Sequence, residues 1–234
     1  DDIEPYRLRK VRLLNGAHTI VVPLALLAGC ETVADAVNDA RVGAFLRHVL
    51  LQELVPSVGA DDAAIFAHQV LERFANPFIR HELIDITLQQ TMKLRVRVVP
   101  SIVEYARTFG GAPRSVAFGF AAWLLYMRDA RTMRTDAHAD HVHAIWRAHA
   151  EPRALVSAIA HDSTLWQTDL STVPNFVGAV TDALESLLNG GVAAALDRHL
   201  AAGDVAAWNA PGVSLVRRKR SDSAEPDQAD SRSA

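Results

Sequence analysis

The chain has 234 residues, of which 50% are apolar and 22% are charged. This composition belongs to folded globular proteins and excludes a disordered chain. With 12 Gly and 10 Pro it argues against a turn-rich β-barrel, and a net charge of −3 leaves no electrostatic footprint for nucleic acid. The single cysteine, Cys30, excludes an intramolecular disulfide and a cysteine-rich zinc module, and it fits a cytoplasmic location.

Apolar residues recur at spacings of three, four and seven along most of the chain, which predicts amphipathic helices. Thr32 and either Asp61 or Asp62 are suitable N-caps for two of them. The predicted helices cover residues 11–28, 32–56, 62–74, 77–92, 98–108, 115–127, 152–160, 172–188 and 191–201. We expect Pro56 to end the second, and the pair Asn76 and Pro77 to end the third.

Few segments compete with this helical pattern. Residues 95–99 alternate with period two, as a short strand would, and the basic stretch 93–97 separates two predicted helices. Residues 130–143 are polar and irregular. The fold class predicted is therefore all-α: one multi-helix domain over residues 1–216, followed by a basic run and a disordered tail over residues 217–234.

No membrane segment is expected. The longest apolar stretches, residues 20–30 and 116–127, are shorter than the roughly 20 residues that span a bilayer. No basic segment followed by an apolar one opens the chain, so no signal peptide is predicted. A start at Asp1 and Asp2, without Met, predicts a piece of a longer protein.

Three polar residues, Lys10, Asn15 and His18, interrupt an otherwise apolar helical stretch. At about 100° per residue, Asn15 lies roughly 140° from Lys10, with His18 between them, so all three can face one cleft. Such a trio suits oxidation of an alcohol or reduction of a ketone. An amine in an apolar cleft can act as general base on a hydroxyl, and an amide and an imidazole can hold the oxygen. A solvated lysine, a capping Asn and a core histidine are the structural alternative.

Residues 8–19 resemble the Lys-x-x-x-x-Asn-x-x-His signature of the mannitol dehydrogenase family, the polyol-specific long-chain dehydrogenases. The amino-acid sequence of residues 10–19 is most similar to that of the hexuronate branch of the family. Residues 52–56, 73–78 and 93–101 match further blocks, in order and at compatible spacing. The helical remainder, to about residue 216, fits the family's C-terminal domain, which resembles that of 6-phosphogluconate dehydrogenase.

The resemblance implies an NAD-dependent oxidoreductase that reduces tagaturonate to altronate, with Lys10 as the general acid/base. Asn15 and His18 would hold and orient the substrate oxygen, and no metal is implied. Reduction of fructuronate, or oxidation of mannitol or another polyol, is the nearest rival. A non-catalytic helical interaction module, lacking the cofactor-binding half, is the alternative from another class.

A uronate substrate also needs a cation for its carboxylate. Lys93, Arg95 and Arg97 are the candidates, with Lys93 preferred because it lies within a matched block. Exposed basic residues with no such role are equally compatible with this pattern. For Arg73 and Asn76 a structural role in their loop is expected instead of contact with substrate.

The family's N-terminal Rossmann-type domain has no counterpart in this sequence. The chain contains no Gly-x-Gly, hence no Gly-x-Gly-x-x-Gly turn for a pyrophosphate. We therefore expect NAD to be bound mainly by such a domain, in cis or in trans, and this chain alone to turn over little. An apolar face left uncovered would make the chain associate.

A histidine-rich run is the second candidate site. His138 and His141 would share a helix face and could hold a metal with Asp140, near His143, Asp136 and His149. A solvated polar linker is the favoured interpretation, because the run lacks His-Glu-x-x-His. The remaining histidines, His48, His68, His81, His161 and His199, are interpreted as ordinary helix-surface or interface residues.

Overall fold

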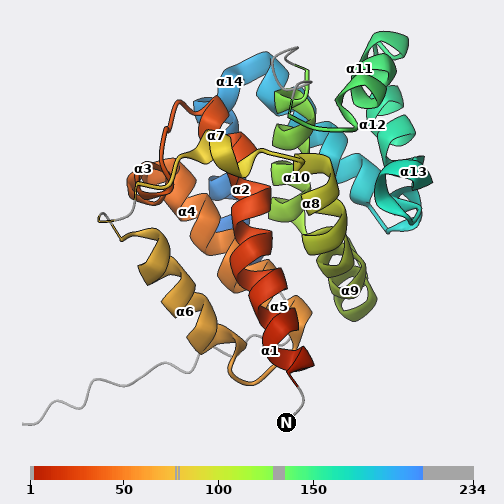
Figure 1. Cartoon of the computed structure of the whole chain (residues 1–234). Helices are drawn as coiled ribbons and strands as arrows, with labels where there is room; N and C mark the ends of the chain where they lie inside the picture. Colours follow the sequence, from red (N-terminus) through yellow and green to blue (C-terminus); the bar gives the residue numbers. More distant parts are fainter. Residues whose placement is uncertain (1–2, 77, 79, 129–134, 208–234) are drawn as a thin grey trace, which may run out of the picture.

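The computed structural model describes residues 3–76, 78, 80–128 and 135–207, and this part of the chain is mainly helical (Figure 1). Within it no strand forms, and the only β-type pairing is an isolated antiparallel bridge between Thr32 and Glu82. The all-α prediction is confirmed. The predicted tail, residues 217–234 with its basic run, lies outside the described residues.

In chain order the helices are α1 (Glu4–Arg9), the π-helical turn η1 (Lys10–Asn15), α2 (Gly16–Leu27), α3 (Val33–Asn38), α4 (Ala40–His48), the π-helical turn η2 (Val49–Leu54), α5 (Val55–Val58), α6 (Ala63–Phe74), α7 (Leu83–Ile86), α8 (Gln90–Arg97), α9 (Val99–Phe109), α10 (Arg114–Tyr126), α11 (Ala139–Ala148), α12 (Pro152–His161), α13 (Ser163–Trp166), the 3₁₀ turn η4 (Leu170–Thr172) and α14 (Phe176–Ala207). Inside α14, Gly191 has φ 70° and ψ 170°, so the helix has two arms, as the two predicted segments 172–188 and 191–201 require.

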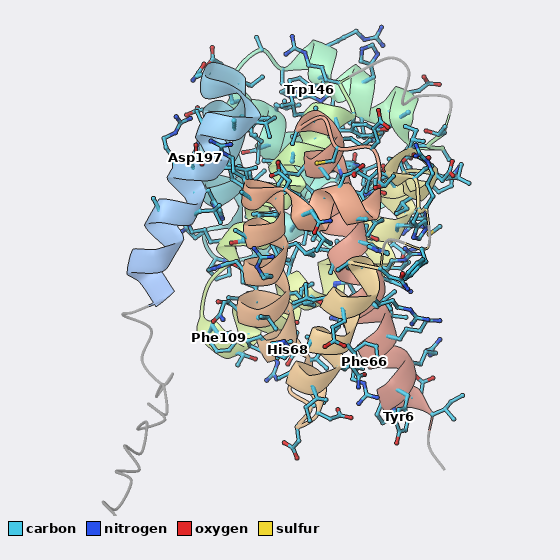
Figure 2. All side chains as sticks on the ribbon, turned by 90° about the vertical axis from the view of Figure 1, so that its left-hand side faces the viewer. Tyr6, Phe66, His68, Phe109, Trp146 and Asp197 are labelled. Carbon is cyan, nitrogen blue, oxygen red and sulfur yellow. The ribbon has the colours of Figure 1, made fainter. Side chains whose placement is uncertain are left out.

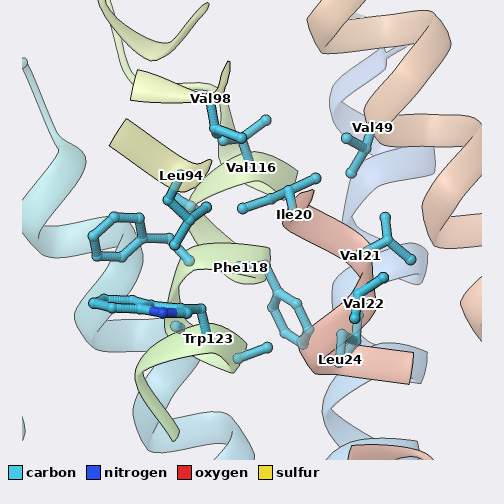
Figure 3. Close-up of a cluster of buried hydrophobic side chains, with 14 of the residues drawn as sticks. Ile20, Val21, Val22, Leu24, Val49, Leu94, Val98, Val116, Phe118 and Trp123 are labelled. Atoms are coloured by element: carbon cyan, nitrogen blue, oxygen red, sulfur yellow. The ribbon is translucent and has the colours of Figure 1, made fainter. Parts of the chain in front are cut away.

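The core forms where α10 lies against α2 and against α14. Every residue of α10 from Ser115 to Leu124 is buried, because the helix is apolar on all sides. Gly119 lets α2 approach closely, since a Cβ there would lie 2.6 Å from a side-chain carbon of Ile20. Figure 3 shows Ile20 and Phe118 on the side of α10 that faces α2, and Trp123 on the opposite side of α10.

The N-terminal helices are held by charged and aromatic contacts. The Arg9 guanidinium lies 5.1 Å from the Tyr6 ring centroid and 5.0 Å from that of Phe66, and it pairs with Asp62. Tyr6 and Phe66 lie on neighbouring helices at one end of the molecule (Figure 2). These contacts fix α1 and η1 against α6, and so fix the wall of the site described below.

Several helix ends differ from the prediction. Thr32 does cap α3, through a full capping box with Asp35. Pro56, however, stands in the first turn of α5, where proline is tolerated, and the helix ends at Gly59 with φ 65°.

The basic stretch is also not as predicted. Residues 93–97 lie inside α8, and residues 95–99 pass from α8 into α9 instead of forming a strand. A five-residue alternation without a pairing strand has no partner for its backbone groups, so helical packing prevails. Of the predicted helix 77–92, only the short α7 and the start of α8 form in the described residues.

The continuous helical run Glu4–Leu27 is long and apolar enough to cross a membrane by length and composition, with a mean hydropathy of 1.2. Of the 18-residue window with this hydropathy, 56% is buried inside the protein, and α2 packs on α10. Burial in the core accounts for the apolar character of this run.

Candidate functional site

A pocket of about 360 Å³ opens beside the first helical run. Its walls come from four parts of the fold, namely η1 with α2, α3, α6 and the loops that follow α6. The lining residues are Lys10, Leu14, His18, Val33, Arg73, Phe74, Asn76 and His81. Basic and amide groups thus meet over an apolar floor, as in pockets that orient a polar small molecule.

The π-helical turn η1 brings Lys10 and His18 onto one side of the helix. The Gly16 N–H donates to the carbonyl of Val11, five residues earlier. A π turn advances each residue by less than the roughly 100° of an α-helix, so residues four and eight apart line up more closely. Gly16 also allows α8 to come near, because a Cβ there would lie 3.2 Å from the carbonyl oxygen of Arg97.

Lys10 lies at the mouth of the pocket. Its side chain is exposed, and within the described part of the chain it has no hydrogen bond or ion pair. The expectation of an amine already desolvated in an apolar cleft is therefore wrong for this structure, because no described element covers the mouth.

His18 is the buried group of the pocket. Its ring stacks on Phe74 at a centroid distance of 3.8 Å and meets His81 edge-on at 5.7 Å. Burial, followed by electrostatic interaction with His81 and Arg97, lowers the pKa of His18 to about 3. Nε2 of His18 is buried without a hydrogen-bond partner in the described residues. A neutral imidazole with an unpaired nitrogen is ready to bind a ligand oxygen.

Asn15 does not share this pocket. It lines a neighbouring recess of about 440 Å³ together with Arg12, Arg97 and Pro100. Of the three residues predicted to face one cleft, Lys10 and His18 do so and Asn15 does not. The helical wheel assumes a uniform 100° per residue, and η1 does not follow that rule.

The three predicted carboxylate anchors also lie outside the pocket. The Lys93 ammonium donates to the carbonyl of Ile86 at 2.8 Å, and burial, with Arg97 nearby, lowers its pKa. Arg97 donates to the hydroxyl of Thr19 at 3.3 Å and lies close enough to His18 to affect its pKa. Arg95 lines another recess, beside Trp166.

Sequence reasoning missed three polar residues of the pocket: Arg73, Asn76 and His81. For Arg73 and Asn76 it favours a structural role in their loop, although residues 73–78 match a family block and that match is the available signal. His81 has no sequence signal. The Val33 N–H donates to its carbonyl at 3.0 Å, next to the isolated bridge, and so brings it to the pocket.

In the histidine-rich run, the side chains of Asp136 and His141 bind other parts of the fold. His138 precedes α11, and the side chain of Asp136 accepts hydrogen bonds from the N–H groups of His138 and Thr91. His141 pairs with Asp162 at 2.5 Å, across to the cap of α13. Across the described residues, no group of three His, Cys, Asp or Glu side chains is placed to hold a metal ion.

Comparison with known proteins gives a consistent result. The family described as mannitol dehydrogenase C-terminal domain matches residues 2–188. Altronate oxidoreductase of Pectobacterium atrosepticum is 36% identical over 216 residues, covering 85% of this chain and 44% of that protein. Altronate oxidoreductase of Yersinia enterocolitica is 35% identical over 208 residues, covering 84% and 43%. The chain therefore spans less than half the length of these relatives.

Two solved structures share the fold. The Pseudomonas fluorescens mannitol 2-dehydrogenase ternary complex with NAD and D-mannitol has a TM-score of 0.75 at 24% identity, covering 86% of this chain and 42% of that chain. A D-sorbitol dehydrogenase in substrate-free form has a TM-score of 0.67 at 20% identity, covering 83% and 41%. At these identities the likeness concerns the fold alone.

Proposed function

The chain belongs to the mannitol dehydrogenase family, as its C-terminal domain, and from this premise we propose that it is the substrate-binding and acid/base half of an NAD-dependent oxidoreductase that reduces tagaturonate to altronate in the cytoplasm. The observation that carries the proposal is the pocket in which Lys10 and the unpaired Nε2 of His18 meet. The altronate oxidoreductase names of the relatives support the hexuronate substrate.

Lys10 and His18 would act on the same substrate oxygen. When the ketone is reduced, its oxygen gains negative charge and must receive a proton, which the Lys10 ammonium supplies. His18 remains neutral, and in its Nε2–H tautomer it donates a hydrogen bond to that oxygen as the charge develops. In altronate oxidation the same two groups would act in reverse, with Lys10 accepting the hydroxyl proton. Asn15, in the neighbouring recess, would reach this oxygen only from the other side of η1.

NAD would supply or accept the hydride when bound. The described residues contain no parallel sheet, and the sequence has no Gly-x-Gly, so the features that hold a dinucleotide are not found in this part of the chain. Cofactor binding therefore belongs, in this proposal, to a Rossmann-type domain supplied in cis or in trans.

Arg73 is the best-placed partner for a substrate carboxylate, because it lines the pocket and its planar guanidinium fits a carboxylate in a two-pronged contact. Arg97 adds positive potential near His18. Lys93, bound to the Ile86 carbonyl, and Arg95, in another recess, would need to move to reach the same substrate. A cation inside the pocket favours a uronate over a neutral polyol, since a buried carboxylate without a partner is costly.

Three alternatives are distinguishable from this proposal. Fructuronate offers the same carboxylate and differs in stereochemistry, and mannitol lacks the carboxylate. A non-catalytic helical module is favoured by one observation, the absence of a cofactor-binding fold in the described residues.

The test joins this chain to the N-terminal portion of the Pectobacterium relative and follows NADH oxidation with tagaturonate. Replacing Lys10 with Ala should reduce kcat by about 10²-fold to 10⁴-fold, the usual contribution of a positioned acid. Arg47→Ala is the control, because Arg47 is an exposed cation of α4 outside the pocket, and it should retain most of the activity. A folded fusion that turns over none of tagaturonate, fructuronate or fructose would overturn the enzyme proposal and leave the binding module.

A further inference from the structure

The recess of about 440 Å³ that contains Asn15, which we name the Asn15 recess, shares no lining residue with the Lys10 pocket. It is formed by α1, η1, the end of α8 and the start of α9. Its lining residues are Glu4, Arg7, Leu8, Val11, Arg12, Asn15, Val96, Arg97 and Pro100. The volume is in the range of small-molecule sites, and the proposed reaction places its substrate in the other pocket.

Two half-buried guanidinium groups of this recess have no carboxylate in contact with them. Arg12 donates to the hydroxyl of Ser101 at 3.0 Å, and Arg97 donates to the hydroxyl of Thr19 at 3.3 Å. Ser101 and Thr19 are buried, so these bonds hold the two guanidinium groups in place. Neither arginine forms an ion pair with a described residue, and each bond uses only one of five N–H donors. Both arginines therefore keep donors for a ligand.

The cost of this arrangement also points to an anion. Burial lowers the pKa of Arg12 and that of Arg97, because each cation is partly removed from water. The hydroxyl groups that they contact are neutral and cannot balance the two charges. A bound anion would offset this cost.

The recess remains positive when the neighbouring acids are counted. Glu4 pairs with Arg7 at 3.1 Å, so these two charges cancel. Glu104 lies close enough to Arg12 to affect its pKa, but it pairs with Arg107 at 2.6 Å, so this second acid is also balanced. The two half-buried arginines are left over among the described residues, and their combined charge matches that of a dianion.

We propose that the Asn15 recess binds a small sugar phosphate, with the phosphate bound by Arg12 and Arg97. A phosphate monoester has a charge close to −2 at neutral pH and three strong acceptor oxygens, which suits two guanidinium groups. The Asn15 amide can donate to and accept from hydroxyl groups of the sugar. The apolar wall, which includes Val11 and Pro100, would cover the carbon atoms of the ligand.

The experiment measures binding of glucose 6-phosphate to the 234-residue chain at pH 8 by calorimetry, with glucose as the uncharged counterpart. A salt concentration of about 0.15 M screens charges that lie farther apart than about 8 Å, so binding then reports direct contact. Glucose 6-phosphate should bind saturably and at least about tenfold more tightly than glucose, because only the phosphate reaches both arginines.

Substitutions of arginine locate the bound phosphate. Arg12→Gln and Arg97→Gln should each weaken glucose 6-phosphate binding by about tenfold or more, the usual effect of losing a charge-assisted contact. Arg73→Gln is the matched control, because it removes an arginine from the Lys10 pocket, and it should leave this binding unchanged. Loss of binding in Arg73→Gln would place the ligand in the Lys10 pocket and overturn the proposal, whatever the outcome for the reductase reaction.

A pair of charged substitutions at Val96 tests the recess while both arginines stay in place. Val96 lines the recess and is 47% exposed, so neither new side chain has to be buried. Val96→Glu should weaken glucose 6-phosphate binding roughly fivefold by repelling the phosphate, whereas Val96→Lys should retain or tighten it. The proposal is also overturned by equal effects of these two variants, by unaffected Arg12→Gln and Arg97→Gln, by glucose binding as tightly as its phosphate, or by no saturable binding to the folded chain.

Discussion

The protonation of His18 depends on the groups that surround the ring. Because its pKa is lowered from 6.5 to about 3, the unfolded chain binds a proton between these two pH values and the folded chain does not. The free energy of unfolding should therefore decrease as the pH falls through this range, by up to about 1.4 kcal/mol per pH unit from this residue.

Urea unfolding of the wild-type chain and of His18→Asn between pH 7 and pH 4 measures this contribution. The variant should lose less stability than the wild type over that interval, and above pH 7 the two should respond to pH alike. NMR resonances of the His18 ring that titrate near pH 6.5 in the folded chain would contradict the prediction.

The carboxylate contact proposed for Arg73 predicts a change in substrate preference. In the assembled enzyme, Arg73→Gln should raise the KM for tagaturonate about tenfold and leave the KM for fructose, which lacks a carboxylate, nearly unchanged. Arg80→Gln is the control, because Arg80 is exposed and paired with Glu82. Equal increases in KM for both ketoses would show that Arg73 shapes the pocket without recognising the acid.

For single residues, the sequence predicts the site correctly where the spacing of the residues matches the geometry of the helix that carries them. The pattern singles out Lys10 and His18, and both line the pocket. The helical wheel places Asn15 in the same cleft because it assumes a regular α-helix, whereas the structure places Asn15 in the neighbouring recess. His81 could not have been found, since a β-bridge distant in sequence from η1 brings it there.

At the scale of elements, the helices themselves are predictable and their ends less so. Periodicity locates most of them, and Thr32 has the capping role expected of it. The π-helical turns η1 and η2 leave no sequence signal, because their hydrogen bonds depend on close packing against neighbouring helices. The expectation for Pro56 is wrong because proline is compatible with the first turn of a helix as well as with its end.

We expect that replacing Glu53, a residue of η2, makes the folded chain less stable. Each oxygen of this buried carboxylate accepts one N–H from the first turn of α10, so one side chain of η2 caps another helix. A glutamine offers one acceptor and places its NH₂ against the other N–H. Glu53→Gln should lower the free energy of unfolding by about 2 kcal/mol at pH 8.

Thermal and urea unfolding would measure this loss. Glu72→Gln, at an exposed position of α6, is the control and should stay within about 0.5 kcal/mol of wild type. A Glu53→Gln variant as stable as the control would mean that the buried carboxylate contributes nothing beyond its amide counterpart.

For the whole molecule, the composition and the helical periodicity are enough to predict the all-α class. Which helices meet is not predictable: α2 and α14 pack on α10 from distant parts of the chain, and Gly119 acquires its role only where Ile20 reaches it. The pocket depends on the same assembly, since its walls come from η1, α2, α3 and α6 together.

Three apolar side chains near His81 in the sequence are exposed. Phe78, which precedes His81, is 93% exposed, and Ile84 and Leu88, which follow it, are 56% and 55% exposed. Removing these side chains from water is favourable by about 25 cal/mol per Å². The chain alone should therefore self-associate.

In sedimentation velocity the mean sedimentation coefficient of the chain should rise over about a hundredfold increase in concentration, as mass action requires. The double variant Phe78→Ser with Leu88→Ser should suppress that rise, whereas Ala144→Ser, at an exposed position of α11, should not. A chain that sediments as a monomer at every concentration would show that the exposed side chains of Phe78, Ile84 and Leu88 do not drive self-association.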